Sequence, residues 1–166
     1  IKMPMLPQDR NAQLNLSSLL TKIGMLIDII YIFSFVSRIQ AKLVDKLREL
    51  AARRKLDNLT IGPVLTWDNT RIKEHIDKLL AIPGARLEFG GKELTGHKIP
   101  SIYGSYEPTA VFVPLKEIAK EEHFDLVTKE LFGPFQVITS YNDEELDVVL
   151  DILERMEHHL TAAVVS

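Results

Sequence analysis

Cysteine is absent from this 166-residue chain. Its residues can therefore form no disulfide, no thiolate metal site and no cysteine nucleophile. A surplus of basic residues is also absent, since the formal net charge is -3 and the sequence pI is about 6.0. Such a chain has no positive field to attract a phosphate backbone, so we expect no nucleic-acid partner.

A long uninterrupted apolar run is lacking as well. The most apolar stretch, Leu19 to Val36, has the sequence LLTKIGMLIDIIYIFSFV, which is shorter than the ~20 residues that a membrane helix usually needs. It contains Lys22 and Asp28, and each costs about 2.5–3.5 kcal/mol near the centre of a bilayer. We expect a buried or partner-covered helix here, and a membrane span is the disfavoured alternative.

No targeting signal is visible in the first residues. Residues 3–15 are polar and proline-bearing, without the Arg-rich and Ser-rich amphipathic pattern of a transit peptide. The chain begins at Ile1 instead of methionine, which we take as an indication of a fragment or a processed product.

Composition and periodicity indicate one α/β domain. With a hydrophobic fraction of 46%, a chain of this size can bury roughly 70% of its unfolded surface. Short β-branched and aromatic runs predict four strands with helical stretches between them, which favours a largely parallel sheet with flanking helices. The expected strands are Ala85–Phe89, Thr109–Val113, Phe135–Thr139 and Thr161–Val165.

Apolar residues at helical spacing predict three main helices. The first covers Ala41–Leu56, the second runs from the N-cap Asp68 to a stop at Pro83, and the third covers Asn142–Met156 and opens with a capping pair. A brief exposed helix is expected over Lys116–His123. The apolar faces are predicted at Leu43, Leu47, Leu50 and Ala51, then at Ile72, Ile76, Leu79 and Leu80, and last at Leu146, Val149, Leu150 and Leu153.

No metal site is predicted. His75 lies beside an apolar stripe without a second ligand at metal spacing, so we interpret it as structural. His158 and His159 are adjacent and would point apart on a helix. The acidic face of the third helix spreads its carboxylates along solvent and does not gather the oxygen cage that calcium or magnesium requires. Gly90-Gly91 lacks the spacing of a phosphate loop and indicates a turn.

The segment Leu126–Tyr141 carries the strongest indication of chemistry. Glu130 precedes the ring of Phe132 by two residues, and the bend at Gly133-Pro134 leads into a buried strand. In an extended chain the carboxylate and the ring would face the same side, so together they could contact a ribose and the flat ring beside it. A solvated loop carboxylate and an ordinary core ring are the competing interpretation.

The sequence TKELFGPF within this segment resembles the E-x-F-G-P signature of the aldehyde dehydrogenases. The resemblance implies that Glu130 holds the nicotinamide-ribose hydroxyls of NAD and that Phe132 packs on the cofactor. It leaves residues 1–36 unmatched and makes residues 37–166 a partial aldehyde dehydrogenase catalytic domain. Further segments resemble the plant-type delta-1-pyrroline-5-carboxylate dehydrogenases, namely DNLTIGPVLTW (Asp57 to Trp67), the FGG of Phe89 to Gly91, EPTAVFVP (Glu107 to Pro114) and HLTAAVVS (His159 to Ser166).

That family oxidises glutamate semialdehyde, formed from delta-1-pyrroline-5-carboxylate, to glutamate. The resemblance thus implies an NAD-dependent, mitochondrial, homo-oligomeric enzyme acting on a small aldehyde. Because the family attacks the aldehyde with a cysteine thiolate, we assign no catalytic residue in this chain, and we expect the chain alone to be inactive and to bind NAD weakly or not at all. The alternative is a non-catalytic remnant or an assembly module that pairs with full-length subunits.

Overall fold

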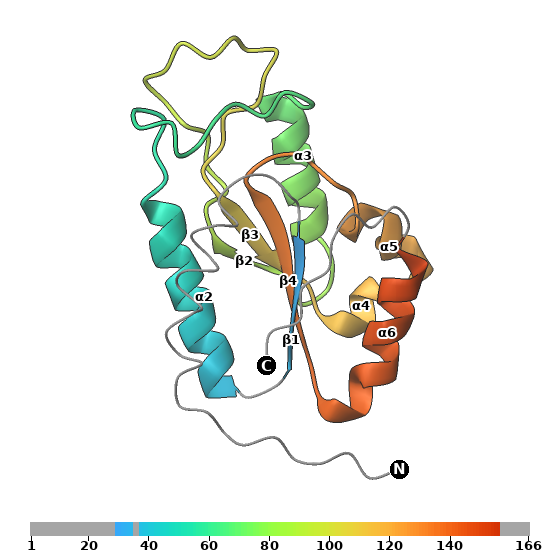
Figure 1. Ribbon diagram of the computed structural model, residues 1–166. Coiled ribbons are helices and arrows are strands. Elements are labelled where there is room, and N and C mark those ends of the chain that lie inside the picture. The colour runs from blue at the N-terminus through green and yellow to red at the C-terminus, as the bar shows by residue number, and fades with distance from the viewer. Residues whose placement is uncertain (1–28, 35–36, 157–166) are drawn as a thin grey trace.

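A four-stranded sheet lies at the centre of the protein, with the strands in the order β1-β4-β3-β2 (Figure 1). The structure, a computed structural model, describes residues 29–34 and 37–156. Strand β4 pairs in parallel with β1 and with β3, and β2 pairs with β3 in antiparallel. The largely parallel α/β sheet is therefore confirmed. Its strands are β1 (Ile29–Ser34), β2 (Arg86–Phe89), β3 (Thr109–Phe112) and β4 (Phe135–Tyr141).

The direction of each strand follows from the connection before it. Between β3 and β4 the chain forms the short helices α4 (Leu115–Ile118) and α5 (Glu121–Val127), and such a crossover returns the chain in parallel. Between β2 and β3 the described chain has no helix, and Glu93 bridges Tyr106 in antiparallel. That return makes β2 the antiparallel edge, which the sequence did not predict.

Strand β1 corrects one expectation. A helix was predicted over Leu19 to Val36, but Ile29–Ser34 form a strand whose Ile30 pairs with Val137 of β4. The sequence IIYIFS is rich in β-branched and aromatic residues, which favour strands. The rest of that stretch lies outside the described residues, as do the predicted strand Thr161–Val165 and the histidines that precede it. Among the described residues, no helix is long and apolar enough to cross a membrane.

Helices cover both faces of the sheet (Figure 1). Helix α2 (Ser37–Ala52) lies on one face, where Val44 and Leu47 pack against Phe112 and Ile138. On the opposite face, helix α3 (Asn69–Leu80), the helices α4 and α5, and helix α6 (Leu146–Arg155) enclose a larger core. The alternation of side chains along β3 and β4 supplies residues to both cores.

Helix α3 begins and packs as predicted. The carboxylate of Asp68 accepts a hydrogen bond of 2.8 Å from the backbone N–H of Arg71, which satisfies one of the free donors of the first turn. Ile72, Ile76 and Leu79 are buried, whereas Leu80 is 36% exposed and lies outside the core.

Helix α6 packs by a different face from the one predicted. Its capping pair is present, since Asn142 and Glu145 form a capping box at the short 3-10 helix η2 (Asp143–Glu145). However, Val149 and Ile152 are the buried residues of this helix. Of the predicted face only Val149 is buried, and the large apolar residues left exposed are Leu146, Val148, Leu150 and Leu153.

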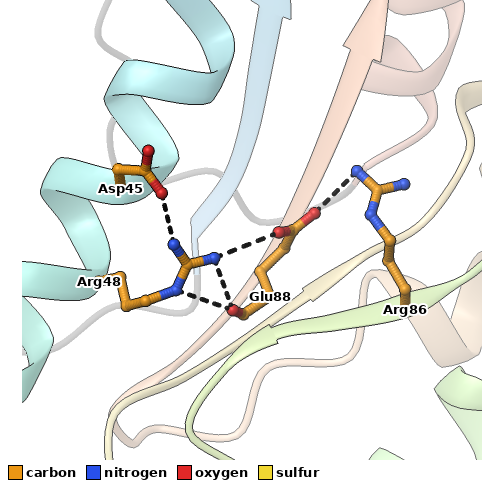
Figure 2. A network of polar contacts seen from close by, with 4 residues as sticks. All are labelled: Asp45, Arg48, Arg86 and Glu88. Carbon is orange, nitrogen blue, oxygen red and sulfur yellow. Dashed lines mark hydrogen bonds and ion pairs between the residues drawn. The ribbon is translucent and has the colours of Figure 1, made fainter.

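A polar network ties helix α2 to strand β2 (Figure 2). The guanidinium of Arg48 donates to the backbone carbonyl of Glu88 through Nε at 3.2 Å and a terminal nitrogen at 3.0 Å, and it also pairs with Asp45. The carboxylate of Glu88 in turn pairs with Arg86 at 2.8 Å. Arg86 lies 3.8 Å above the ring of Phe112, so the network continues onto the face of the sheet.

Candidate cofactor-facing loop

Glu130 and Phe132 lie in the loop between α5 and β4, on either side of Leu131. Glu130 is exposed, Phe132 is 51% exposed, and Leu131 is 1% exposed. The backbone of Phe132 has a φ of 53°, the left-handed conformation that most side chains avoid. The backbone at Phe132 is therefore not extended as expected, although the exposed Glu130 and Phe132 on either side of the buried Leu131 keep the alternation that an extended chain would give.

One segment distant in sequence, residues 64–66, holds this loop and is itself held by Gly104. The hydroxyl Oγ1 of Thr66 donates a 2.8 Å hydrogen bond to the carbonyl of Leu131. Behind the loop, Val64 is 1% exposed and packs so closely on Gly133 that a Cβ there would lie 2.6 Å from the Cγ2 of Val64. Val64 also exchanges backbone hydrogen bonds of 2.7 and 2.9 Å with Gly104. Three loops thus meet at one valine.

His75 lies in the core near the start of β4 and is 5% exposed. Its ring makes edge contacts with Trp67 and with Phe135, at centroid distances of 5.3 and 5.5 Å. Burial, with the nearby charges of Lys78 and Lys129 adding to it, lowers the pKa of His75 to about 4. The ring is therefore neutral at pH 7. Within residues 29–34 and 37–156, no three His, Cys, Asp or Glu side chains are placed to share a metal ion.

A second buried ionisable group, Glu117, lies in α4 and faces the start of α5. The Glu117 side chain is 6% exposed, and its carboxylate is 2.7 Å from Nζ of Lys120 and 3.4 Å from Nδ1 of His123. The hydrogen bond from Lys120 lowers the pKa of Glu117. This cluster fastens two short helices together and lies apart from the loop that carries Glu130.

The exposed groups of the loop fit a nicotinamide nucleotide in chemical type. A carboxylate such as Glu130 accepts hydrogen bonds from two neighbouring ribose hydroxyls, and a half-exposed ring such as Phe132 offers an apolar face to a flat heterocycle. Sequence reasoning missed the supports Val64 and Thr66. The signal was present, since both belong to the segment DNLTIGPVLTW that drew the family resemblance.

Known proteins resemble this chain in sequence and in fold. No protein-family model matches the sequence. The Arabidopsis thaliana protein named Delta-1-pyrroline-5-carboxylate dehydrogenase 12A1, mitochondrial, is 62% identical over 125 residues. That match covers 75% of this chain and 22% of the Arabidopsis protein, so the chain spans about a fifth of the length of this relative.

Solved structures resemble the fold. Glyceraldehyde-3-phosphate dehydrogenase from Methanocaldococcus jannaschii, complexed with NADP, matches with a TM-score of 0.52 at 19% identity, over 75% of this chain and 25% of that one. Aldehyde dehydrogenase 21 from Physcomitrella patens, in complex with succinate, matches with a TM-score of 0.53 at 16% identity, over 85% and 27% of the two chains.

The chain is thus similar in sequence to part of a plant dehydrogenase and similar in fold to part of the aldehyde dehydrogenases. The plant dehydrogenase is the delta-1-pyrroline-5-carboxylate dehydrogenase of Arabidopsis.

Proposed function

We propose that this chain is part of an NAD-dependent dehydrogenase that oxidises glutamate semialdehyde to glutamate in proline catabolism, with Glu130 and Phe132 as its cofactor-binding residues. The name and 62% identity of the Arabidopsis relative support the reaction. One structural observation carries the site: Glu130 and the half-exposed Phe132 flank a buried Leu131 on a loop that Thr66 and Val64 hold in place.

In this proposal, NAD supplies the electron acceptor for oxidation of the aldehyde when it is bound. The carboxylate of Glu130 accepts hydrogen bonds from the ribose hydroxyls, and charge-assisted bonds of this kind are short and directional. Phe132 packs on the cofactor beside the ribose and excludes water from that side. The thiolate nucleophile must come from residues outside this chain, which has no cysteine.

Three wider properties belong to the same proposal. The proposed enzyme is mitochondrial, as the name of the Arabidopsis protein states for that relative. It is a homo-oligomer, and its second substrate is a small aldehyde. The NADP complex of the Methanocaldococcus enzyme supports a nicotinamide nucleotide for the fold, and we propose NAD as the form used here.

A hybrid enzyme tests the site. In the Arabidopsis relative, the 125 matching residues are replaced by those of this chain, and NAD reduction with delta-1-pyrroline-5-carboxylate is measured. We expect Glu130→Gln to weaken NAD binding and slow turnover by roughly 10- to 100-fold, since one oxygen becomes a hydrogen-bond donor and the charge is lost. The matched control is Glu154→Gln on the exposed surface of α6. Equal rates in the parent and in Glu130→Gln would remove Glu130 from the site.

The second candidate is a non-catalytic protein that associates with full-length subunits. The absence of cysteine and the exposed apolar side chains of α6 favour it. The mass of the endogenous protein separates the candidates, with detection by an antibody raised against Lys116–Tyr141. A species several times heavier than 18.9 kDa supports the dehydrogenase, whereas one near 18.9 kDa supports the non-catalytic protein.

A further inference from the structure

We propose that Thr66 is the positioning residue of the cofactor-facing loop, because its hydroxyl fixes the peptide unit that directs the ring of Phe132. This inference rests on the proposed cofactor role of Phe132. It adds a residue that never touches the cofactor but decides where the ring lies.

The hydrogen bond acts on the right peptide unit. The carbonyl of Leu131, which accepts the 2.8 Å bond from Thr66 Oγ1, belongs to the same rigid plane as the backbone nitrogen of Phe132. Rotation of Phe132 about its N–Cα bond is measured from that plane. A hydrogen bond that fixes the orientation of this carbonyl therefore fixes the peptide plane relative to which Phe132 has its unusual φ of 53°. Left-handed backbone at a residue other than glycine persists only where the surroundings impose it.

The scaffold that presents Thr66 is independent of its hydroxyl. Val64, two residues earlier, is fixed by its paired backbone hydrogen bonds to Gly104 and by its contact with Gly133. On the other side, Asp68 caps helix α3 through the backbone N–H of Arg71. Removing the hydroxyl should therefore free the peptide of Leu131 while the neighbouring backbone stays in place.

A positioning residue such as Thr66 acts through the placement of the Phe132 ring more than through cofactor affinity. Phe132 is 51% exposed, and a rotated peptide would move its ring relative to a bound nucleotide. A misplacement of about 1 Å in a reacting group can slow a reaction by about 100-fold. A loosened loop would thus change the turnover rate and the use of the cofactor more than it changes the stability of the fold.

The first test uses the 166-residue chain and amide hydrogen exchange. Thr66→Val removes the hydroxyl at nearly constant shape, and Thr66→Ser keeps it. We expect the amides of Phe132 and Gly133 to exchange about fivefold faster in Thr66→Val, as the loss of one hydrogen bond implies, and at the parent rate in Thr66→Ser. The amide of Val111 in the core strand β3 serves as the control. Equal exchange at Phe132 and Gly133 in all three proteins would overturn the inference.

The second test places the same substitutions in the hybrid enzyme. Thr66→Val should lower kcat/KM for NAD by about tenfold or more, with Thr66→Ser restoring the parent value. An unchanged value in Thr66→Val beside a strong effect of Glu130→Gln overturns this inference alone, whereas no effect of Glu130→Gln overturns the proposed function. If the hybrid does not fold, the exchange comparison decides, because it needs only this chain.

Discussion

The imidazole of His75 meets the ring of Phe135 edge to face, with the ring centroids 5.5 Å apart and the planes at 70°. Phe135 is the first residue of β4, so this contact fixes helix α3 to the strand that follows the cofactor-facing loop. The Nε2 atom of His75 is buried and has no hydrogen-bond partner among the residues that the structure describes. The histidine is held there by packing, and a proton on it would be destabilising.

Acidification should therefore weaken the fold through His75. The pKa is about 4 in the folded protein against an ordinary value of 6.5, so the unfolded chain binds the proton first as the pH falls. The free energy of unfolding should drop between pH 6.5 and pH 4, by about 1–2 kcal/mol on going from pH 7 to pH 5. Urea unfolding at pH 7 and pH 5 measures it.

His75→Leu is the control for this prediction, because it removes the titrating group and the unpartnered nitrogen together. The comparison stays above the usual range of carboxyl groups, where loss of the Glu117 interactions would add a fall of the same sign. An identical pH dependence in the parent and His75→Leu would show that other groups govern it.

Substitutions at Gly90 and Gly96 distinguish the cost of backbone strain from the cost of a steric clash. Their φ angles are nearly equal, at 77° and 74°. A Cβ at Gly90 would lie 2.2 Å from the carbonyl oxygen of Pro108, whereas a Cβ at Gly96 would have no atom of the described residues within 4 Å. Gly96→Ala should cost about 1–2 kcal/mol for backbone strain alone, and Gly90→Ala should cost at least ~3 kcal/mol. Thermal unfolding compares them, and similar losses would contradict the clash.

Helix α6 offers a matched pair of apolar residues. Ile152 is 1% exposed in the core, and Leu150 of the same helix is 54% exposed. Ile152→Ala should destabilise the fold by about 2–5 kcal/mol, and Leu150→Ala by less than ~1 kcal/mol. Denaturant unfolding measures both. A large loss from Leu150→Ala would mean that this face is covered in solution.

The network around Arg48 predicts a smaller effect. Arg48→Met keeps much of the aliphatic stem but removes the donors to the carbonyl of Glu88 and to Asp45. The expected loss is about 1 kcal/mol, because the group is half exposed and the gain from each such bond is modest. Arg53→Met is the control, since within the described part of the chain Arg53 has one ion pair, at 4.0 Å. Equal stability of the two variants would leave the network without a role in docking α2.

Much of this fold follows from periodicity that is local in sequence. The N-cap Asp68, the buried residues of α3 and the strands β3 and β4 were predicted within a few residues. The face of α6 was not, because the sequence LDVVLDILER carries apolar residues on most sides of the helix, so only the sheet beneath it selects Val149 and Ile152. Strand β1 was missed for a related reason, since its partner β4 lies far along the chain.

In the candidate site too, the features that are local in sequence were predicted and those that depend on distant contacts were not. Glu130 and Phe132 were found because the motif that contains them is contiguous, and their cofactor role stays a prediction. The sequence predicted a bend at Gly133-Pro134, but the left-handed φ falls on Phe132, a residue type that rarely adopts it. Thr66 could not be joined to Leu131 by any pattern, because their contact depends on how three loops come together.

The tie between Thr66 and Leu131 joins residues 65 positions apart in the chain. Contacts of such long sequence separation are slow to form, because the intervening chain must first lose its freedom. In this protein the intervening chain holds α3, the strands β2 and β3, and the helices α4 and α5. The loop that carries Phe132 should therefore reach its final shape only after this intervening chain has folded, so that the ring is presented by the folded domain and not by the isolated loop.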